Sequence, residues 1–133
     1  MEGRAQRKPL VAIVDDDEMI CEATKELIET FGLTARAFNS GQAFLDSDCV
    51  RQTSCLVVDV QMPGMSGLQL HRKLTTSNQR IPIVFVTAFP DEATRKRALK
   101  AGAICYLPKP FDPKKLHNCI RSAIGHWADE TDI

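Results

Sequence analysis

Short, nearly continuous apolar runs alternate along this chain with segments of helical periodicity, and this alternation constrains the fold more than any other feature. The runs that predict strands are residues 10–14, 34–38, 55–58, 81–86 and 103–107. Apolar character on successive residues is typical of strands in a parallel sheet that is covered on both faces. Because helices link parallel strands, the pattern predicts an α/β domain.

The intervening segments carry apolar stripes at the spacing of amphipathic helices. In the first and last segments these stripes recur at i, i+4, i+7, i+8 and i+11. The first stripe is Ile20, Thr24, Leu27, Ile28 and Phe31, and the last is Leu116, Ile120, Ala123, Ile124 and Trp127. Shorter helices are predicted after Asn39 or Ser40, after Ser66 and over residues 91–101. Right-handed crossovers then predict a doubly wound five-stranded parallel sheet with five helices and the flavodoxin-like order 2-1-3-4-5.

Length and charge restrict the possible organisation and partners. With 133 residues, the chain fits one folded domain, predicted over 9–128, between a polar N-terminal tail at 1–8 and an acidic tail at 129–133. Lys plus Arg and Asp plus Glu both total 17, which predicts no general attraction to nucleic acid or membranes. No apolar run approaches the ~20 residues of a membrane span, and the first residues, MEGRAQRKP, are polar, unlike those of a signal sequence. We therefore expect a cytoplasmic protein that contacts neither membrane nor nucleic acid directly.

The cysteines and histidines predict no metal site and no disulfide framework. The 5 cysteines are scattered and form no C-x-x-C pair, so we interpret them as reduced packing residues. They are Cys21, Cys49, Cys55, Cys105 and Cys119. The three histidines, His71, His117 and His126, lack metal-ligand spacing and are interpreted as surface or half-buried side chains.

Polar side chains follow several predicted strands where each strand ends. They are Asp15, Asp16 and Asp17 after the first strand, Asp59 after the third, Thr87 after the fourth and Lys109 after the fifth. An aspartate at such a position is, by itself, more often a turn former or helix cap. The carboxyl ends of parallel strands share one edge of a sheet, however, so these residues are expected to converge there.

Such a cluster has a definite chemistry. Two carboxylates within ~4 to 6 Å repel each other by ~1 to 4 kcal/mol, so the site needs positive charge. Oxygen ligands with open coordination suit Mg²⁺, and Lys109 supplies a second cation. A carboxylate such as Asp59 can then attack a phosphoryl donor, and Thr87 and Lys109 can contact the resulting acyl phosphate.

Four motifs in this order resemble the response regulator receiver domain of two-component systems over about residues 9–126. They are VDDDE at 14–18, VVDVQMPGMSGL at 57–68, VTA at 86–88 and YLPKPF at 106–111. The VDDDE, PGMSGL and KPF details are similar to the nitrogen-fixation type of transcriptional regulator, in which a DNA-binding domain follows the receiver. Whether the chain stands alone or belongs to a longer regulator stays open.

The resemblance assigns a role to each candidate residue. It implies that Asp59 is the phosphoacceptor and that Thr87 and Lys109 contact the phosphoryl group. Mg²⁺ or Mn²⁺ would bind Asp15, Asp16, Asp59 and the backbone carbonyl of Gln61. Thr87 and Tyr106 would form the conformational switch, while Gln61 and Phe89 would tune hydrolysis. Lys109–Pro110 would be a cis peptide.

By the same resemblance, the domain would be a signalling phosphoacceptor, not an enzyme with an external substrate. Its phosphoryl donor would be a phosphohistidine on a sensor histidine kinase or a phosphotransfer protein. The output would be a conformational change of the face built by the fourth helix, fifth strand and fifth helix, which is also a possible homodimer surface.

Two other functions are conceivable for a domain with this set of residues. A phosphatase similar to the haloacid dehalogenase family is disfavoured because Asp59-Val60-Gln61 lacks the second aspartate of that family. A degenerate receiver that binds a partner without phosphorylation stays open.

The basic segment Arg95, Lys96, Arg97 and Lys100 predicts either a solvated helix face or a docking face. Gly64 and Gly67 are interpreted as turn and helix-start residues, because the pattern of a phosphate-binding loop is absent.

Overall fold

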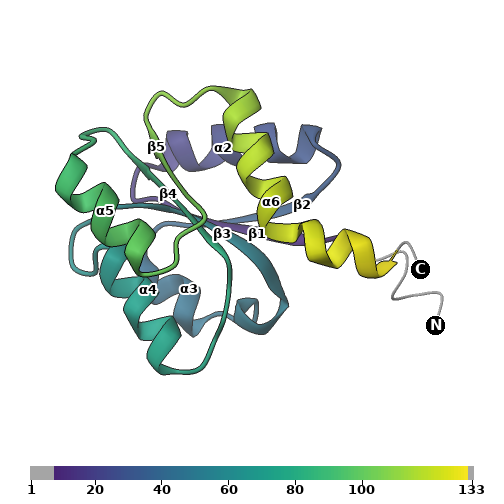
Figure 1. The fold of residues 1–133 in the computed structure, drawn as a ribbon, viewed down its shortest axis with the longest axis horizontal. Coiled ribbons are helices and arrows are strands. Elements are labelled where there is room, and N and C mark those ends of the chain that lie inside the picture. The colour runs from purple at the N-terminus through teal and green to yellow at the C-terminus, as the bar shows by residue number, and fades with distance from the viewer. Residues whose placement is uncertain (1–7, 132–133) are drawn as a thin grey trace.

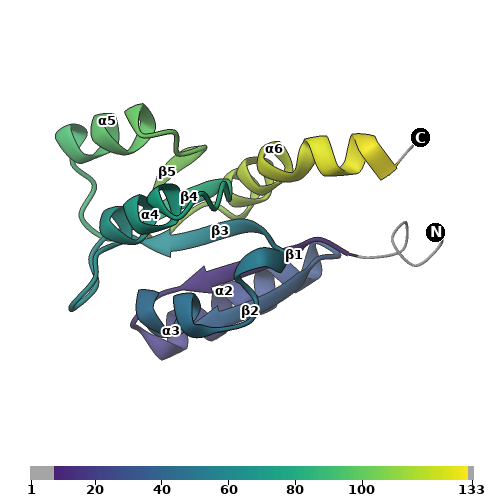
Figure 2. The ribbon, with the colours of Figure 1, turned by 90° about the horizontal axis from the view of Figure 1, so that it is seen from below.

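The computed structural model describes residues 8–131, with side chains described up to residue 125. The strands are β1 (Leu10–Val14), β2 (Thr34–Phe38), β3 (Thr53–Asp59), β4 (Ile83–Thr87) and β5 (Cys105–Pro108). The helices are α2 (Glu18–Thr30), α3 (Gly41–Asp46), α4 (Gly67–Thr76), α5 (Glu92–Lys100) and α6 (Pro113–Thr131), with a 3₁₀ turn, η1, at Val50–Gln52. All strand pairs are parallel, in the order β2-β1-β3-β4-β5, which Figure 2 shows across the sheet. The predicted fold is confirmed.

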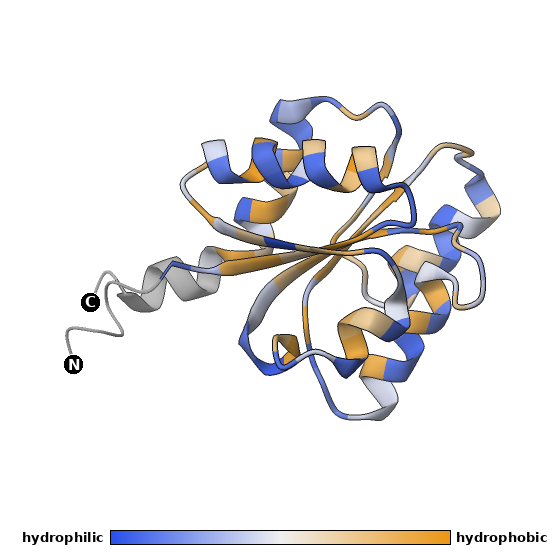
Figure 3. Ribbon diagram, turned by 180° about the vertical axis from the view of Figure 1, so that it is seen from behind, coloured by the Kyte–Doolittle hydropathy of each residue, from blue (hydrophilic) through white to orange (hydrophobic). Residues whose placement is uncertain are grey.

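Two helical layers enclose the sheet. Helices α2 and α6 cover one face, and α3, α4 and α5 cover the other (Figure 1). Apolar residues colour the strands and the inner sides of the helices, while the outer helix surfaces are hydrophilic (Figure 3). Burial on both faces explains why β3 and β4 have continuous apolar sequences. No helix within residues 8–131 combines the length and apolar character of a membrane span.

Local hydrogen bonds explain where strand boundaries differ from the predicted ones. Strand β4 begins at Ile83, two residues later than predicted, after Pro82, which has no N–H to donate to the ladder. Strand β5 begins at Cys105 instead of Ala103, because the Ala103 N–H donates to the Ala98 carbonyl at the end of α5. Helix α6 continues to Thr131, past the predicted domain boundary at 128. The predictions for residues 1–7 and for the side chains of His126 and Trp127 lie outside the described part of the chain.

Side-chain caps start the helices near the carboxyl edge of the sheet. Asp17 accepts hydrogen bonds from two backbone N–H groups of α2, and Ser40 and Asp91 cap α3 and α5 in the same way. Ser66 and Gln69 form a capping box at the start of α4. Each cap ends the preceding loop at a defined residue, so the loops that carry the polar residues have fixed end points.

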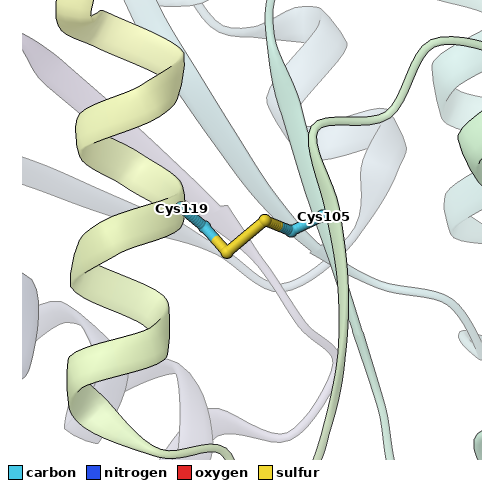
Figure 4. The surroundings of a disulfide bond; sticks show 2 residues. All are labelled: Cys105 and Cys119. Carbon is cyan, nitrogen blue, oxygen red and sulfur yellow. A yellow bond between two sulfur atoms is a disulfide. The ribbon is translucent and has the colours of Figure 1, made fainter.

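The prediction that all cysteines are reduced is wrong for one pair. Cys105 of β5 and Cys119 of α6 form a disulfide (Figure 4), whereas the other three cysteines are free and buried. Strand alternation directs Cys105 toward α6, and helical spacing places Cys119 on the same buried stripe as Leu116 and Ile120. The two positions are 14 residues apart in no recognisable motif, so the sequence alone did not reveal the pairing.

Two histidines pack as predicted. His117 stacks on Phe31 with ring centroids 4.1 Å apart, and His71 lies edge-on to Phe85. Burial lowers the pKa of His71. The basic side chains Arg95, Lys96, Arg97 and Lys100 of α5 are exposed, which agrees with both predicted alternatives, a solvated helix face and a docking face.

Candidate functional site

The site begins where β1 and β3 end side by side. Val14 is the register partner of Val58, so Asp15 and Asp59, the next residues in each strand direction, become neighbours. Both are buried, with 2% and 7% of their surface exposed. Asp16 joins them from the exposed side, and one carboxylate oxygen from each of the three residues lies within 4.8 Å of the others. The predicted convergence of the acidic cluster with Asp59 is therefore confirmed.

Lys109 reaches this cluster from the loop after β5. Its Nζ lies 2.7 Å from Asp15 Oδ2 and 3.0 Å from Asp59 Oδ2. Its backbone N–H donates to the Thr87 carbonyl at 2.7 Å, which fixes the loop against the end of β4. The Lys109–Pro110 peptide is cis, as expected. One cation thus bridges the aspartates of two adjacent strands.

Burial and the contact between Asp59 and Lys109 shift the pKa of each of these two residues in opposite directions. Burial raises the pKa of Asp59, and the hydrogen bond and charge of Lys109 offset this only in part. Burial lowers the pKa of Lys109, but its hydrogen bonds to Asp15 and Asp59 outweigh that effect, so the pKa is raised overall. Lys109 therefore remains an ammonium group at neutral pH, next to a carboxylate that is only partly compensated.

A second set of contacts connects Asp59 to β4. Thr87 is fully buried at the end of β4, and its hydroxyl donates to Gln61 Oε1 at 2.6 Å. The same hydroxyl accepts a hydrogen bond from the Phe89 N–H at 3.0 Å. The Gln61 N–H donates to Asp59 Oδ1 at 3.1 Å. The Gln61 side chain is therefore a partner of Thr87, a contact that sequence analysis missed because 26 residues separate the two positions.

The remaining predicted residues lie around this centre. Tyr106 is half-buried on the face of β5 that packs with α4 and α5, and its hydroxyl accepts a hydrogen bond from the Asp91 N–H at 3.3 Å. This bond joins Tyr106 to the N-cap of α5. The side chain of Phe89 is 73% exposed, so it does not line the buried part of the site. Asp17 caps α2, which is the helix-cap role that an aspartate directly after a strand often has.

Gly67 allows α4 to approach the end of β3 closely. A Cβ at this position would lie 2.6 Å from the Asp59 carbonyl oxygen and 3.1 Å from the Val60 Cα. These contacts are with backbone atoms, which cannot turn away. The Gly67 N–H also donates to the Val60 carbonyl at 2.9 Å, which closes the loop after Asp59. Gly67 is thus a close-approach residue as well as the first residue of α4.

We predict that Gly67→Ala lowers the free energy of unfolding by ~1–3 kcal/mol, because the added methyl must displace the backbone beside Asp59. Urea unfolding measures the change. Gly125→Ala is the matched control, since a Cβ there meets no atom within 4 Å and alanine favours the helix. Equal stability of the two variants would contradict the close-approach role.

The donor set suits a hard divalent cation. Asp15, Asp16 and Asp59 offer carboxylate oxygens, and the backbone of Gln61 lies two residues beyond Asp59 in the adjoining loop. Asp16 is exposed, so one side of the cluster is open to water and to further ligands. Oxygen-only donors with an open side are the arrangement that Mg²⁺ and Mn²⁺ favour. The residues present therefore fit the predicted ion.

Fold and site together define a flavodoxin-like α/β domain whose acidic centre is bridged by a lysine at the carboxyl edge of a parallel sheet. Residues 11–121 match the response regulator receiver domain family, and the chain belongs to that family. Receiver domains of this family act in phosphorylation-dependent signalling in two-component systems. The rival phosphatase interpretation receives no support from this match.

Individual relatives agree with the family assignment. The chain is 39% identical over 118 residues to the response regulator protein TmoT of Ectopseudomonas mendocina, covering 89% of this chain and 54% of that protein. It is 33% identical to the transcriptional regulatory protein FixJ of Azorhizobium caulinodans, covering 90% of this chain and 57% of the relative. The similarity to FixJ confirms the predicted nitrogen-fixation type of subgroup. The chain spans about half the length of the curated relatives that it matches.

Solved structures give the same result. The response regulator StyR is 40% identical with a TM-score of 0.83, and the match covers 94% of this chain and 63% of StyR. The crystal structure of FixJ-N is 32% identical with a TM-score of 0.81, and the match covers 91% of this chain and 97% of that one. The backbone arrangement described above is therefore that of known receiver domains.

Proposed function

We propose that this domain is a phosphorylation-dependent switch in which Asp59 accepts a phosphoryl group from a phosphohistidine of a sensor histidine kinase or phosphotransfer protein. The observation that carries the proposal is the pair of contacts from Lys109 Nζ to Asp15 and Asp59, at 2.7 and 3.0 Å. They place a fixed cation beside the one carboxylate that ends β3. Negative charge that develops on a transferred phosphoryl group would meet this ammonium group without reorganisation.

In the transfer step, a carboxylate oxygen of Asp59 attacks phosphorus while the bond between phosphorus and the donor imidazole breaks. The imidazole leaves with the electron pair of that bond, and the product is an acyl phosphate on Asp59. Lys109 and the Thr87 hydroxyl are the groups of this chain that can contact its oxygens. When bound at Asp15, Asp16, Asp59 and the Gln61 carbonyl, Mg²⁺ or Mn²⁺ would supply further neutralisation of phosphoryl charge.

The conformational step would begin at Thr87. The phosphoryl group carries a charge of about −1.5 to −2, in place of the single negative charge of the free carboxylate, and its oxygens attract the Thr87 hydroxyl. That hydroxyl must first leave Gln61 Oε1, its partner at 2.6 Å. Tyr106 would turn into the space that Thr87 vacates and would lose its hydrogen bond from Asp91. The affected face consists of α5, β5 and α6, which are the fourth helix, fifth strand and fifth helix of the domain.

Gln61 competes with the phosphoryl group for the Thr87 hydroxyl, and this yields a prediction. Gln61→Leu removes the acceptor at 2.6 Å, and a net hydrogen bond contributes about 1 kcal/mol. We therefore expect beryllofluoride, a phosphoryl mimic, to bind about fivefold more tightly to the variant in the presence of Mg²⁺. Fluorescence or calorimetric titration measures the affinity. Gln42→Leu, on the exposed side of α3, is the control and should bind as the wild type does. Weaker binding to Gln61→Leu would contradict the competition.

Phe89 yields a separate prediction about hydrolysis. Its N–H anchors it to Thr87, two residues away, so its side chain can lie over a phosphoryl group and hinder attacking water. Phe89→Glu replaces the apolar ring with a carboxylate and should shorten the lifetime of phosphorylated Asp59 several-fold. The rate of loss of the added mass, followed after removal of the donor, measures this effect. An unchanged rate would show that Phe89 is only an exposed loop residue.

Incubation with acetyl phosphate and Mg²⁺, followed by intact mass spectrometry, tests the proposed function. We expect one added phosphoryl group per chain, which is labile in base, and a strong reduction in the yield when EDTA replaces the metal. Retention of the unmodified mass under all conditions would favour a degenerate receiver that binds its partner without phosphorylation.

The proposed function also implies where the domain acts and what it contacts. We infer a cytoplasmic location, where a kinase of this type delivers its phosphoryl group, and a possible homodimer through the α5, β5 and α6 face. The domain turns over only its own phosphoryl group and is not an enzyme with an external substrate. Because the relatives are about twice as long, any contact with DNA would be made by a separate output domain. Analytical ultracentrifugation with and without beryllofluoride tests the homodimer.

A further inference from the structure

Cys105 and Cys119 join β5 to α6, two elements that share a hydrophobic core cluster. Strand β5 lies at the edge of the sheet and pairs with β4, whereas α6 packs across the face of the sheet. The disulfide runs from the first residue of β5 to the middle of α6 (Figure 4). Its Cα atoms are 6.2 Å apart, within the range of ordinary disulfides.

The same two side chains also fit the protein as thiols. Cys119 is 7% exposed within the core cluster of α2 and α6, and Cys105 packs against that cluster while remaining half-buried. A thiol behaves as a small apolar side chain, so reduction leaves no strongly polar group unsatisfied. The half-buried Cys105 remains open to small reagents, in contrast to the buried Cys21, Cys49 and Cys55.

We propose that Cys105 and Cys119 form a reversible redox modification site whose co-reactant is a low-molecular-weight disulfide. In a reducing compartment, where this domain is proposed to act, disulfides are usually transient and regulatory. The thiolate of Cys105 attacks a sulfur of the reagent, the reagent S–S bond breaks, and one thiolate leaves. The Cys119 thiolate then attacks the Cys105 sulfur of the mixed disulfide and expels the second thiolate. The two cysteine protons end on the two expelled thiols, so a reagent disulfide is reduced as the protein disulfide forms.

Oxidation has a structural consequence at β5. Tyr106 follows Cys105 directly and faces the opposite side of the sheet, and Lys109 lies four residues beyond Cys105. A covalent tie to α6 therefore restrains the strand that carries both residues. Oxidised protein should unfold at a temperature higher by on the order of 5–10 °C than reduced protein. The amides of residues 105–107 should exchange more slowly with solvent in the oxidised form.

Alkylation in denaturant after equilibration with glutathione buffers tests the site. Reduced protein should react with iodoacetamide at all 5 cysteines, whereas oxidised protein should react only at the three free cysteines. We expect the distribution to shift reversibly between these states as the ratio of reduced to oxidised glutathione changes. Full alkylation even in excess oxidised glutathione would overturn the proposal. Protection that persists in excess reduced glutathione would also overturn it, because it would indicate a permanent structural bond.

Single variants separate the roles of the two cysteines. Cys119→Ser should accumulate one bound glutathione at Cys105, whereas Cys105→Ser should accumulate none at the buried Cys119. The Cys49→Ser control should still form the bond and still show the thermal shift. The same titration in Asp59→Asn should be unchanged, so the redox proposal and the phosphorylation proposal can fail independently. Loss of the redox shift in Cys49→Ser, or equal glutathione binding by the other two variants, would contradict the assignment.

Discussion

Asp59→Asn is expected to abolish phosphoryl transfer from acetyl phosphate, with at least a 100-fold loss in the rate of incorporation. A neutral amide at this position is a poor nucleophile toward phosphorus, and no other carboxylate of the site has Asp59's position at the end of β3. Intact mass and a phosphoryl-lability assay measure the loss. Asp48→Asn, an exposed aspartate on the loop before β3, is the matched control and should be phosphorylated normally. Incorporation by Asp59→Asn at the wild-type rate would place the phosphoacceptor elsewhere.

The same substitution should stabilise the fold, because the pKa of Asp59 is raised, chiefly by burial. A carboxyl with a raised pKa binds its proton more tightly in the folded state than in the unfolded state. The favourable contribution of this carboxyl to stability is complete at pH values below 3.8, its pKa in the unfolded chain. It is lost as the pH rises through the higher pKa of the folded state. At neutral pH the ionised carboxylate therefore opposes folding, and Asn relieves this cost. Urea unfolding across this pH window should show a flatter pH dependence in the variant.

Lys109→Met is expected to lower the free energy of unfolding by about 2–4 kcal/mol at neutral pH without metal. The substitution keeps the apolar stem but removes the cation that contacts Asp15 and Asp59, which leaves two buried carboxylates facing each other. The ion pair raises the pKa of Lys109, so its stabilisation is present below the ordinary value of 10.5 and is lost only as pH rises through the higher folded pKa. Chemical unfolding at pH 7 measures the loss.

Magnesium should partly replace the missing charge. A ligand that binds the folded state raises its stability, and the unpaired carboxylates of Lys109→Met should gain more from Mg²⁺ than those of the wild type. Thermal unfolding with increasing Mg²⁺ should therefore show a larger rise in melting temperature for this variant. Lys115→Met, at an exposed position on α6, controls for the loss of one positive charge. Equal destabilisation of the two variants would rule out the bridging role of Lys109.

The sequence predicted the fold well because its signals are local. Apolar runs, capping residues such as Ser66 and Asp91, and helical stripes depend on neighbours within a few residues. Strand boundaries were less accurate where tertiary hydrogen bonds decide them, as at Ala103, whose N–H closes α5 instead of joining the sheet.

The sequence predicted which residues form the site better than it predicted which of them contact one another. Strand ends on one edge bring Asp15, Asp59 and Lys109 together, because topology alone determines that edge. The bond from Thr87 to Gln61 and the pairing of Cys105 with Cys119 depend on side-chain direction across the sheet. No spacing rule connects such distant positions, so only three-dimensional coordinates could reveal them.

The two ends of Thr87 are held differently, and this determines what kind of motion can carry a signal. Its carbonyl accepts a hydrogen bond from the Lys109 N–H, and its strand is paired on both sides, whereas within the described part of the chain its hydroxyl is held by Gln61 and Phe89 alone. Rotation about a single side-chain torsion is therefore easier than sliding of the strand. Rotamer changes are fast compared with domain rearrangements. The rates of phosphorylation and dephosphorylation should therefore limit the rate of the response, because the conformational change of the domain is faster.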